Sequence, residues 1–255
     1  EYPVIVFGCV HNIWHTQARK RAKYELGKRL ASVVCAPDEI GNFSIVDLRR
    51  LKATTEAVHA VFRKGARVHI SSPSGCHFTA VVGTPFCEHG NYGSRGQGGD
   101  FPSGESGFGP AEYSVEGRIV YDVKVQHIGL LESPLTVTVV RDKVIEVEGV
   151  YREAFQQLVN QRGEMLNYVS EISLGLNPNV GVSTRSEFIP EEKTYGTAHC
   201  GHGGNSSYGQ RVGPHIDGVI SCPTVEVDDV RIMQDGRIVG DFLEGDLLSW
   251  LERKR

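Results

Sequence analysis

The chain has 255 residues, a length that suits one large domain or two smaller ones. Its composition is 40% apolar and 23% charged, and no stretch reaches about 18 consecutive apolar residues, which excludes a disordered chain and a membrane-spanning helix. The net charge of −4, from 27 Lys and Arg against 31 Asp and Glu, provides no basic field, so we expect neither nucleic acid nor a membrane as a partner.

The predicted elements change in character at Gly65. Residues 1–65 show an α/β pattern, with a strand at 4–10, a basic helix at about 16–30, an apolar stretch at 31–36 and a helix at about 44–64. The rest is β-rich, with strands at 67–71, 117–125, 135–140, 143–148, 172–176, 218–227 and 231–239 and one helix near 151–167. We therefore predict a mixed α/β (α+β) fold, with a partial N-terminal α/β domain at 1–66 and a larger β-rich domain at 67–255.

The six cysteines are scattered singly, without a C-x-x-C pair, which suits a reducing compartment and predicts a cytoplasmic protein. The apolar run at residues 3–7 follows Glu1 with no charged signal region before it. We expect that an N-terminal portion is missing.

Glycine is unusually frequent: 10 of the 30 glycines fall within residues 83–117 and 7 within 196–218. We interpret both windows as structured loops. Dense glycine with embedded polar residues is typical of a binding loop or of an ordinary irregular connection, and glycine alone leaves both open.

The strongest chemical signal is the segment PHIDG at residues 214–218. In an extended segment, residues two apart project to the same side, so the His215 imidazole and the Asp217 carboxylate form a two-ligand clamp. This pair suits zinc, iron, cobalt or manganese, although such a pair is also common as a structural hydrogen bond.

Further candidate ligands lie in or near the glycine-rich windows. His199 precedes His215 by 16 residues, Glu171 opens a half-buried strand, and Glu105 lies in the other window. Three carboxylates and two imidazoles exceed the needs of one tetrahedral ion and fit two metals bridged by carboxylates. Taken singly, each side chain could equally be exposed or salt-bridged.

Other catalytic schemes fit less well. The sequence has no G-x-S-x-G nucleophile elbow, phosphate-binding P-loop, H-E-x-x-H helix or complete G-x-G-x-x-G fingerprint. His15 follows the first predicted strand, where α/β proteins often place functional loops, but it could equally cap the next helix.

Four short segments stand out in the chain: FPSGE at 101–105, SEISLGLNP at 170–178, EK at 192–193 followed by GTAH at 196–199, and PHIDG at 214–218. In these segments the chain resembles the metalloaminopeptidases typified by aminopeptidase T and aminopeptidase S, and more distantly 2,5-dihydroxypyridine dioxygenase. The aminopeptidase resemblance implies a homodimer, a two-metal cluster held by Glu105, Glu171, His199, His215 and Asp217, and a functional tyrosine for which Tyr208 is the nearest candidate. Family members have a longer N-terminal domain.

The dioxygenase resemblance implies a different centre. It suggests one Fe(II) held by Glu171, His215 and Asp217, with His15 as the acid/base group. That relative has phenylalanine at the position of Glu105 and no histidine at the position of His199.

Our main hypothesis from the sequence is a metal-dependent hydrolase that cleaves an N-terminal peptide bond or a small amide. Two zinc, manganese or cobalt ions would activate a water molecule, and Glu192 or Tyr208 would handle protons or stabilise the oxyanion. The alternative is a mononuclear Fe(II) dioxygenase that opens a hydroxylated pyridine or aromatic ring. A third interpretation is a metal-free binding or scaffold protein.

Overall fold

The computed structural model describes residues 4–8, 16–33, 35–36, 38–43, 46–205 and 213–252. Its helices are α1 (Gln17–Lys20) with the π-helical turn η1 (Arg21–Glu25), α2 (Ile40–Phe43), α3 (Leu48–Val61), α4 (Arg152–Arg162), η2 (Glu164–Asn167), η3 (Pro190–Lys193) and α5 (Gly245–Glu252). The first strands are β1 (Val4–Gly8), β2 (Arg29–Val33), β3 (Arg67–Ser71), β4 (His77–Glu88), β5 (Gly98–Phe101), β6 (Glu105–Pro110), β7 (Glu116–Tyr121), β8 (Lys124–Val125) and β9 (Gly129–Leu130). The remaining strands are β10 (Leu135–Val140), β11 (Lys143–Glu148), β12 (Val169–Gly175), β13 (Thr197–Gly203), β14 (His215–Ser221), β15 (Thr224–Val227), β16 (Val230–Gln234) and β17 (Arg237–Ile238).

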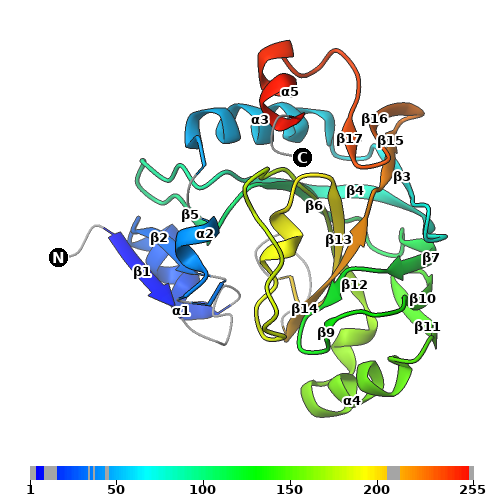
Figure 1. Cartoon of the computed structure of the whole chain (residues 1–255). Coiled ribbons are helices and arrows are strands. Elements are labelled where there is room, and N and C mark those ends of the chain that lie inside the picture. The colour runs from blue at the N-terminus through cyan, green and yellow to red at the C-terminus, as the bar shows by residue number, and fades with distance from the viewer. Residues whose placement is uncertain are drawn as a thin grey trace.

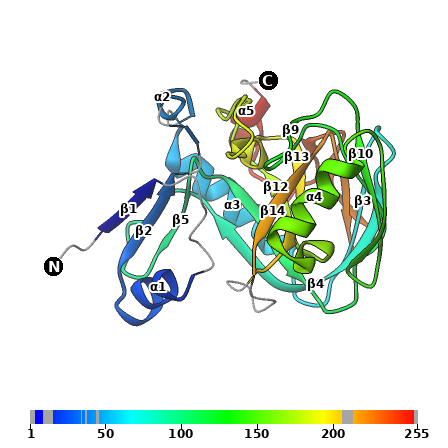
Figure 2. The same ribbon diagram turned by 90° about the horizontal axis from the view of Figure 1, so that it is seen from below.

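The strands form a small and a large sheet. The small sheet is parallel, with the order β1-β2-β5, and lies with α1 to the left of the large sheet in Figures 1 and 2. The large sheet is antiparallel, with the order β17-β16-β15-β3-β4-β6-β12-β13-β14-β8-β9, and β7, β10 and β11 branch from it at β4. This arrangement confirms the predicted mixed α/β fold class.

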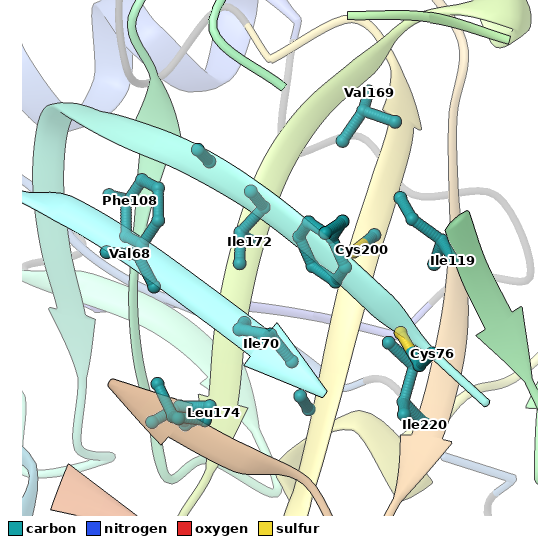
Figure 3. Close-up of a cluster of buried hydrophobic side chains, with 14 of the residues drawn as sticks. Val68, Ile70, Cys76, Phe108, Ile119, Val169, Ile172, Leu174, Cys200 and Ile220 are labelled. Carbon is teal, nitrogen blue, oxygen red and sulfur yellow. The ribbon is translucent and has the colours of Figure 1, made fainter. Parts of the chain in front are cut away.

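The hydrophobic core lies where the strands of the large sheet cross. Figure 3 shows Val68 and Ile70 of β3 in one buried cluster with Ile172 of β12, Cys200 of β13 and Ile220 of β14. All five side chains are buried. Side chains alternate between the two faces of a strand, so this packing directs the neighbouring residues of β12, β13 and β14 to the opposite face.

Helix α3 covers the large sheet beside β4 and β6 (Figure 1). It begins where the Asp47 side chain accepts hydrogen bonds from the backbone N–H groups of Arg49 and Arg50, as is typical of a helix N-cap. Leu51 and Val58, seven residues apart on the same face, are buried in the core.

The structure corrects several boundaries expected from the sequence. The basic helix ends at Glu25, because Gly27 adopts a positive φ of 60° and Arg29 and Leu30 belong to β2, which pairs with β1 and β5. The single strand expected at 218–227 is two strands, β14 and β15, separated at Cys222, which has a φ of 45°. Strands β4, β5, β6 and β13 and helix α5 were not predicted.

The two glycine-rich windows were wrongly interpreted as loops. They contain β5, β6 and β13 and parts of β4 and β14. Glycine is needed in some of these strands because neighbouring atoms approach closely: a Cβ added to Gly107 would lie 2.3 Å from the carbonyl oxygen of Ile172 on the adjacent strand.

The domain boundary near residue 66 stays a prediction. Strand β5 follows this boundary in the sequence but pairs with β2, which precedes it. Among the described residues, no helix is both long enough and apolar enough to cross a membrane.

Candidate metal centre

The five candidate ligands lie on four adjacent strands: Glu105 on β6, Glu171 on β12, His199 on β13, and His215 and Asp217 on β14. The pairing register brings them together. Glu171, Gly201 and Asp217 form one row across β12, β13 and β14, and His199 lies one step along in a row with Ser173. Paired residues of neighbouring strands share a face, so all five side chains project from the face opposite to Ile172 and Cys200.

The ligand atoms are within a few ångströms of one another. His199 Nε2 lies 3.3 Å from Glu105 Oε2 and 3.5 Å from Glu171 Oε1. His215 Nε2 lies 3.1 Å from Asp217 Oδ1 and 3.9 Å from Glu171 Oε2. Two sets of three potential ligands result, Glu105/Glu171/His199 and Glu171/His215/Asp217, each with ligand atoms within 4.8 Å of one another. Glu171 belongs to both sets.

Two neighbours orient these ligands and were not found from the sequence. His215 Nδ1 donates to the Gly204 carbonyl oxygen over 2.8 Å, so the Nε2 nitrogen is the one that faces Asp217. Asn205 Nδ2 donates to Glu171 Oε2 over 2.7 Å. Hydrogen bonds of this kind commonly fix the ring tautomer and the orientation of metal ligands.

Helix η3 adds Glu192 and Lys193 to the cluster. Glu192 forms a third set with His199 and Asp217, again with ligand atoms within 4.8 Å of one another. Lys193 Nζ lies 2.5 Å from Glu105 Oε1 and 2.9 Å from Glu192 Oε1. Lys193 lies in one of the short matching segments of the sequence, but no role was predicted for it.

Burial and mutual charge shift the pKa values in the cluster strongly. Burial raises the pKa of Glu105, but Lys193 and His199 outweigh it and lower the pKa to about 2. Burial opposes protonation of His215, yet Asp217 and Glu171 raise its pKa to about 10. The pKa of Glu192 is well above its usual value, chiefly because of burial. The carboxylates of the cluster thus stabilise positive charge on the groups beside them.

The donor set fits a divalent cation. His199 is buried, its Nδ1 has no hydrogen-bond partner among the residues that the structure describes, and its Nε2 faces the carboxylates of Glu105 and Glu171. A buried imidazole with an incomplete set of hydrogen bonds costs free energy, which a metal–nitrogen bond would offset. Carboxylate oxygens together with imidazole nitrogens suit zinc, iron, manganese or cobalt. The expected candidates His15 and Tyr208 lie outside the described residues.

A family model described as NicX, 2,5-dihydroxypyridine 5,6-dioxygenase, matches residues 4–240. The chain belongs to the NicX family. The main expectation from the sequence, membership of the aminopeptidase family, is not confirmed, whereas the more distant resemblance, to 2,5-dihydroxypyridine dioxygenase, is supported.

Solved structures agree with the NicX family fold. The 2,5-dihydroxypyridine dioxygenase of Pseudomonas putida KT2440 has a TM-score of 0.80 at 20% identity, over 94% of this chain and 72% of that chain. AmpT of Thermus thermophilus has a TM-score of 0.59 at 14% identity, over 92% of this chain and 81% of that chain. At these identities, the similarities show the fold alone. A sequence search of curated proteins gave no match.

Proposed function

We propose that this NicX-family chain is a metal-dependent dioxygenase that opens a hydroxylated pyridine or aromatic ring, with 2,5-dihydroxypyridine as the first substrate to test. The observation that carries the proposal is the family match over residues 4–240, combined with the convergence of Glu171, His215 and Asp217 on one face of the large sheet. This was the alternative in the sequence analysis, and the family match supports it better than the hydrolase.

In this proposal, Glu171, His215 and Asp217 would hold one Fe(II) through carboxylate oxygens and the imidazole Nε2. When bound, the iron supplies the redox chemistry by which dioxygen reacts with the ring. The Gly204 carbonyl oxygen keeps His215 oriented, and Asn205 keeps Glu171 oriented. The Glu192 carboxyl, beside His199 and Asp217, is positioned to hold a proton. His15 keeps its proposed acid/base role.

A second candidate, the two-metal hydrolase, is favoured by Glu105 and His199. These residues and Glu171 form a ligand set of their own, and Glu171 is shared with the set that contains His215 and Asp217. A shared carboxylate is typical of bridged pairs of metal ions. Buried carboxylates are stable only when cations or hydrogen-bond donors neutralise them, and a second divalent ion would provide that charge.

Metal analysis and oxygen uptake distinguish the two candidates. The dioxygenase proposal predicts that the protein purified without chelators holds one iron per chain and consumes dioxygen when 2,5-dihydroxypyridine is added. Replacing His215 by Ala removes a ligand, so we expect loss of the bound iron and oxygen uptake that is slower by more than about 100-fold. This loss exceeds the effect that is usual when only a hydrogen bond to a metal ligand is removed.

His69→Ala is the matched control for His215→Ala. His69 lies on β3, outside the candidate metal centre, and also pairs with a carboxylate, at 3.7 Å from Glu226. This variant should retain iron and oxygen uptake. Two zinc, manganese or cobalt ions per chain, hydrolysis of an aminoacyl amide and no oxygen uptake would refute the dioxygenase and support the hydrolase.

A further inference from the structure

Lys193 is a buried cation at the end of η3, enclosed by carboxylates. Its Nζ lies 2.5 Å from Glu105 Oε1, 2.9 Å from Glu192 Oε1 and 3.6 Å from Asp100 Oδ2. Lysine is rarely fully buried without charged partners, and here three carboxylates share one ammonium group. Burial by itself lowers the pKa of Lys193, but the carboxylates raise it well above its usual value, so the ammonium group stays charged.

The contacts of Glu105 are divided between its two oxygens. Oε1 accepts from Lys193, while Oε2 accepts from Ser173 Oγ over 3.4 Å and faces His199 Nε2 at 3.3 Å. With Oε1 held by the ammonium group, the carboxylate presents Oε2 to the ligand set of His199 and Glu171. The contact with Lys193 therefore occupies one oxygen of Glu105 and turns the other toward His199.

Lys193 is itself held from two sides. Its carbonyl oxygen accepts a hydrogen bond from the backbone N–H of Asn177 over 2.8 Å, which ties η3 to the end of β12. On the other side is Asp100 of β5, whose backbone N–H donates to Glu88 Oε2 over 2.9 Å. Since β5 pairs with β2, Asp100 belongs to the small sheet and contacts the cluster from there.

We propose that Lys193 is a positioning residue of the metal centre, which fixes the carboxylates of Glu105 and Glu192 in the orientation that binds a metal and is anchored by Asp100. The inference rests on the proposed function only in requiring that the cluster binds a divalent ion. That ion is held through Glu105 with His199 and Glu171, or through Glu192 with His199 and Asp217, so the inference concerns these two ligand sets.

The test replaces Lys193 by Met, which has a similar length and no charge. Binding of Mn(II) to the chelator-treated full chain is followed by the electron paramagnetic resonance signal of the free ion. We expect the dissociation constant to rise about 10- to 100-fold, the usual effect of removing a group that orients a metal ligand. Lys193→Arg, which keeps the charge, should restore part of the affinity.

Lys124→Met is the matched control. Lys124 is equally buried and also pairs with a glutamate of η3, with Nζ 3.1 Å from Glu191 Oε1, and its other hydrogen bond is to the carbonyl oxygen of Ser183. This variant removes a buried ammonium group that contacts neither Glu105 nor Glu192. It should destabilise the protein and leave the dissociation constant for Mn(II) within about threefold of the wild-type value.

Three results would overturn the proposal. Unchanged affinity in Lys193→Met would show that the carboxylates need no positioning, and an equal loss in Lys124→Met would show a general effect of destabilisation. Tighter Mn(II) binding in Lys193→Met would mean that the ammonium group only competes with the metal for negative charge.

If Lys193→Met does not fold, Asp100→Asn decides. It removes the acidic group that anchors Lys193 and leaves Lys193 in place, and we expect two- to fivefold weaker Mn(II) binding, whereas wild-type affinity would contradict the proposal. Oxygen uptake is measured separately on the iron-loaded wild type. Failure of that reaction would refute the dioxygenase and leave the Mn(II) result to decide the role of Lys193.

Discussion

Two buried histidines of β13, three residues apart, have opposite electrostatic surroundings. His199 lies beside Glu105 and Glu171, which raise its pKa well above the usual value despite burial. His202 lies between the rings of Tyr121 and Phe155, and burial lowers its pKa from 6.5 to about 4. His202 forms a hydrogen bond of 2.5 Å with the Tyr121 hydroxyl and is a neutral member of the core, while His199 belongs to the charged cluster.

The neutral state of His202 predicts acid sensitivity. Between pH 6.5 and 4 the unfolded chain binds a proton at His202 that the folded protein does not. Neutral His202 therefore makes its full contribution to the free energy of unfolding above pH 6.5. As the pH falls to about 4, this contribution is lost, by an amount on the order of 3 kcal/mol. The free energy of unfolding, measured in urea at the same metal content, should decrease less steeply over this pH range in His202→Gln than in the wild type. Equal slopes against pH in the two proteins would refute the prediction.

At the scale of single elements, close packing between β12, β13 and β14 positions the metal ligands. A Cβ added to Gly201 of β13 would lie 2.5 Å from His215 Cε1 and 2.9 Å from Glu171 Cβ. Glycine at this position allows the side chains of the two flanking strands to approach each other across β13.

Gly201→Ala should therefore displace both ligands. We expect about 10-fold or weaker Mn(II) binding and a free energy of unfolding lower by about 1–3 kcal/mol, as is common for overpacked sites. Calorimetric metal titration and urea unfolding measure the two effects. The control is Gly245→Ala at the start of α5, where an added Cβ meets no atom within 4 Å and stability should change by less than about 0.5 kcal/mol. If Gly201→Ala binds metal as tightly as the wild type, the neighbouring strands accommodate the added Cβ without displacing the ligands, which contradicts the prediction.

At the scale of the whole molecule, the candidate metal centre joins segments distant in sequence. Glu105, Glu171 and His215 come from three strands of the large sheet, and Asp100 of the small sheet contacts the same cluster through Lys193. A cation bound there would link all these segments in the folded state. The homodimer expected from the sequence stays a prediction.

Metal binding should accordingly raise the melting temperature. A ligand at 100 times its dissociation constant stabilises the folded state by about 2.7 kcal/mol, which for a chain of this size corresponds to roughly 5–10 °C. Thermal unfolding with Mn(II) and with excess chelator measures the difference. His215→Ala should melt at the same temperature under both conditions. An equal melting temperature of the wild type with Mn(II) and with chelator would contradict metal binding at this site and support the metal-free interpretation.

Sequence patterns predicted those elements whose local signals agree with their final environment. Helix α3 with its buried stripe and strands β3, β10 and β11 with their alternation were expected within a few residues. The glycine-rich strands were missed, since glycine disfavours a strand locally and is tolerated here only because adjacent backbones and side chains approach closely. The end of the basic helix was missed for a similar reason, since pairing with β1 and β5 draws Arg29 and Leu30 into β2.

The fold class and the five converging residues could be predicted from the sequence, because the clamp of His215 and Asp217 and the acidic positions of Glu105 and Glu171 lie in short recognisable segments. That Lys193, Asn205 and Asp100 join them became visible only in the folded chain. These contacts depend on strand register and on segments far apart in the chain, which no local pattern encodes. The choice between hydrolase and dioxygenase also lay beyond the motifs, because both resemblances imply metal ligands at overlapping positions of this chain.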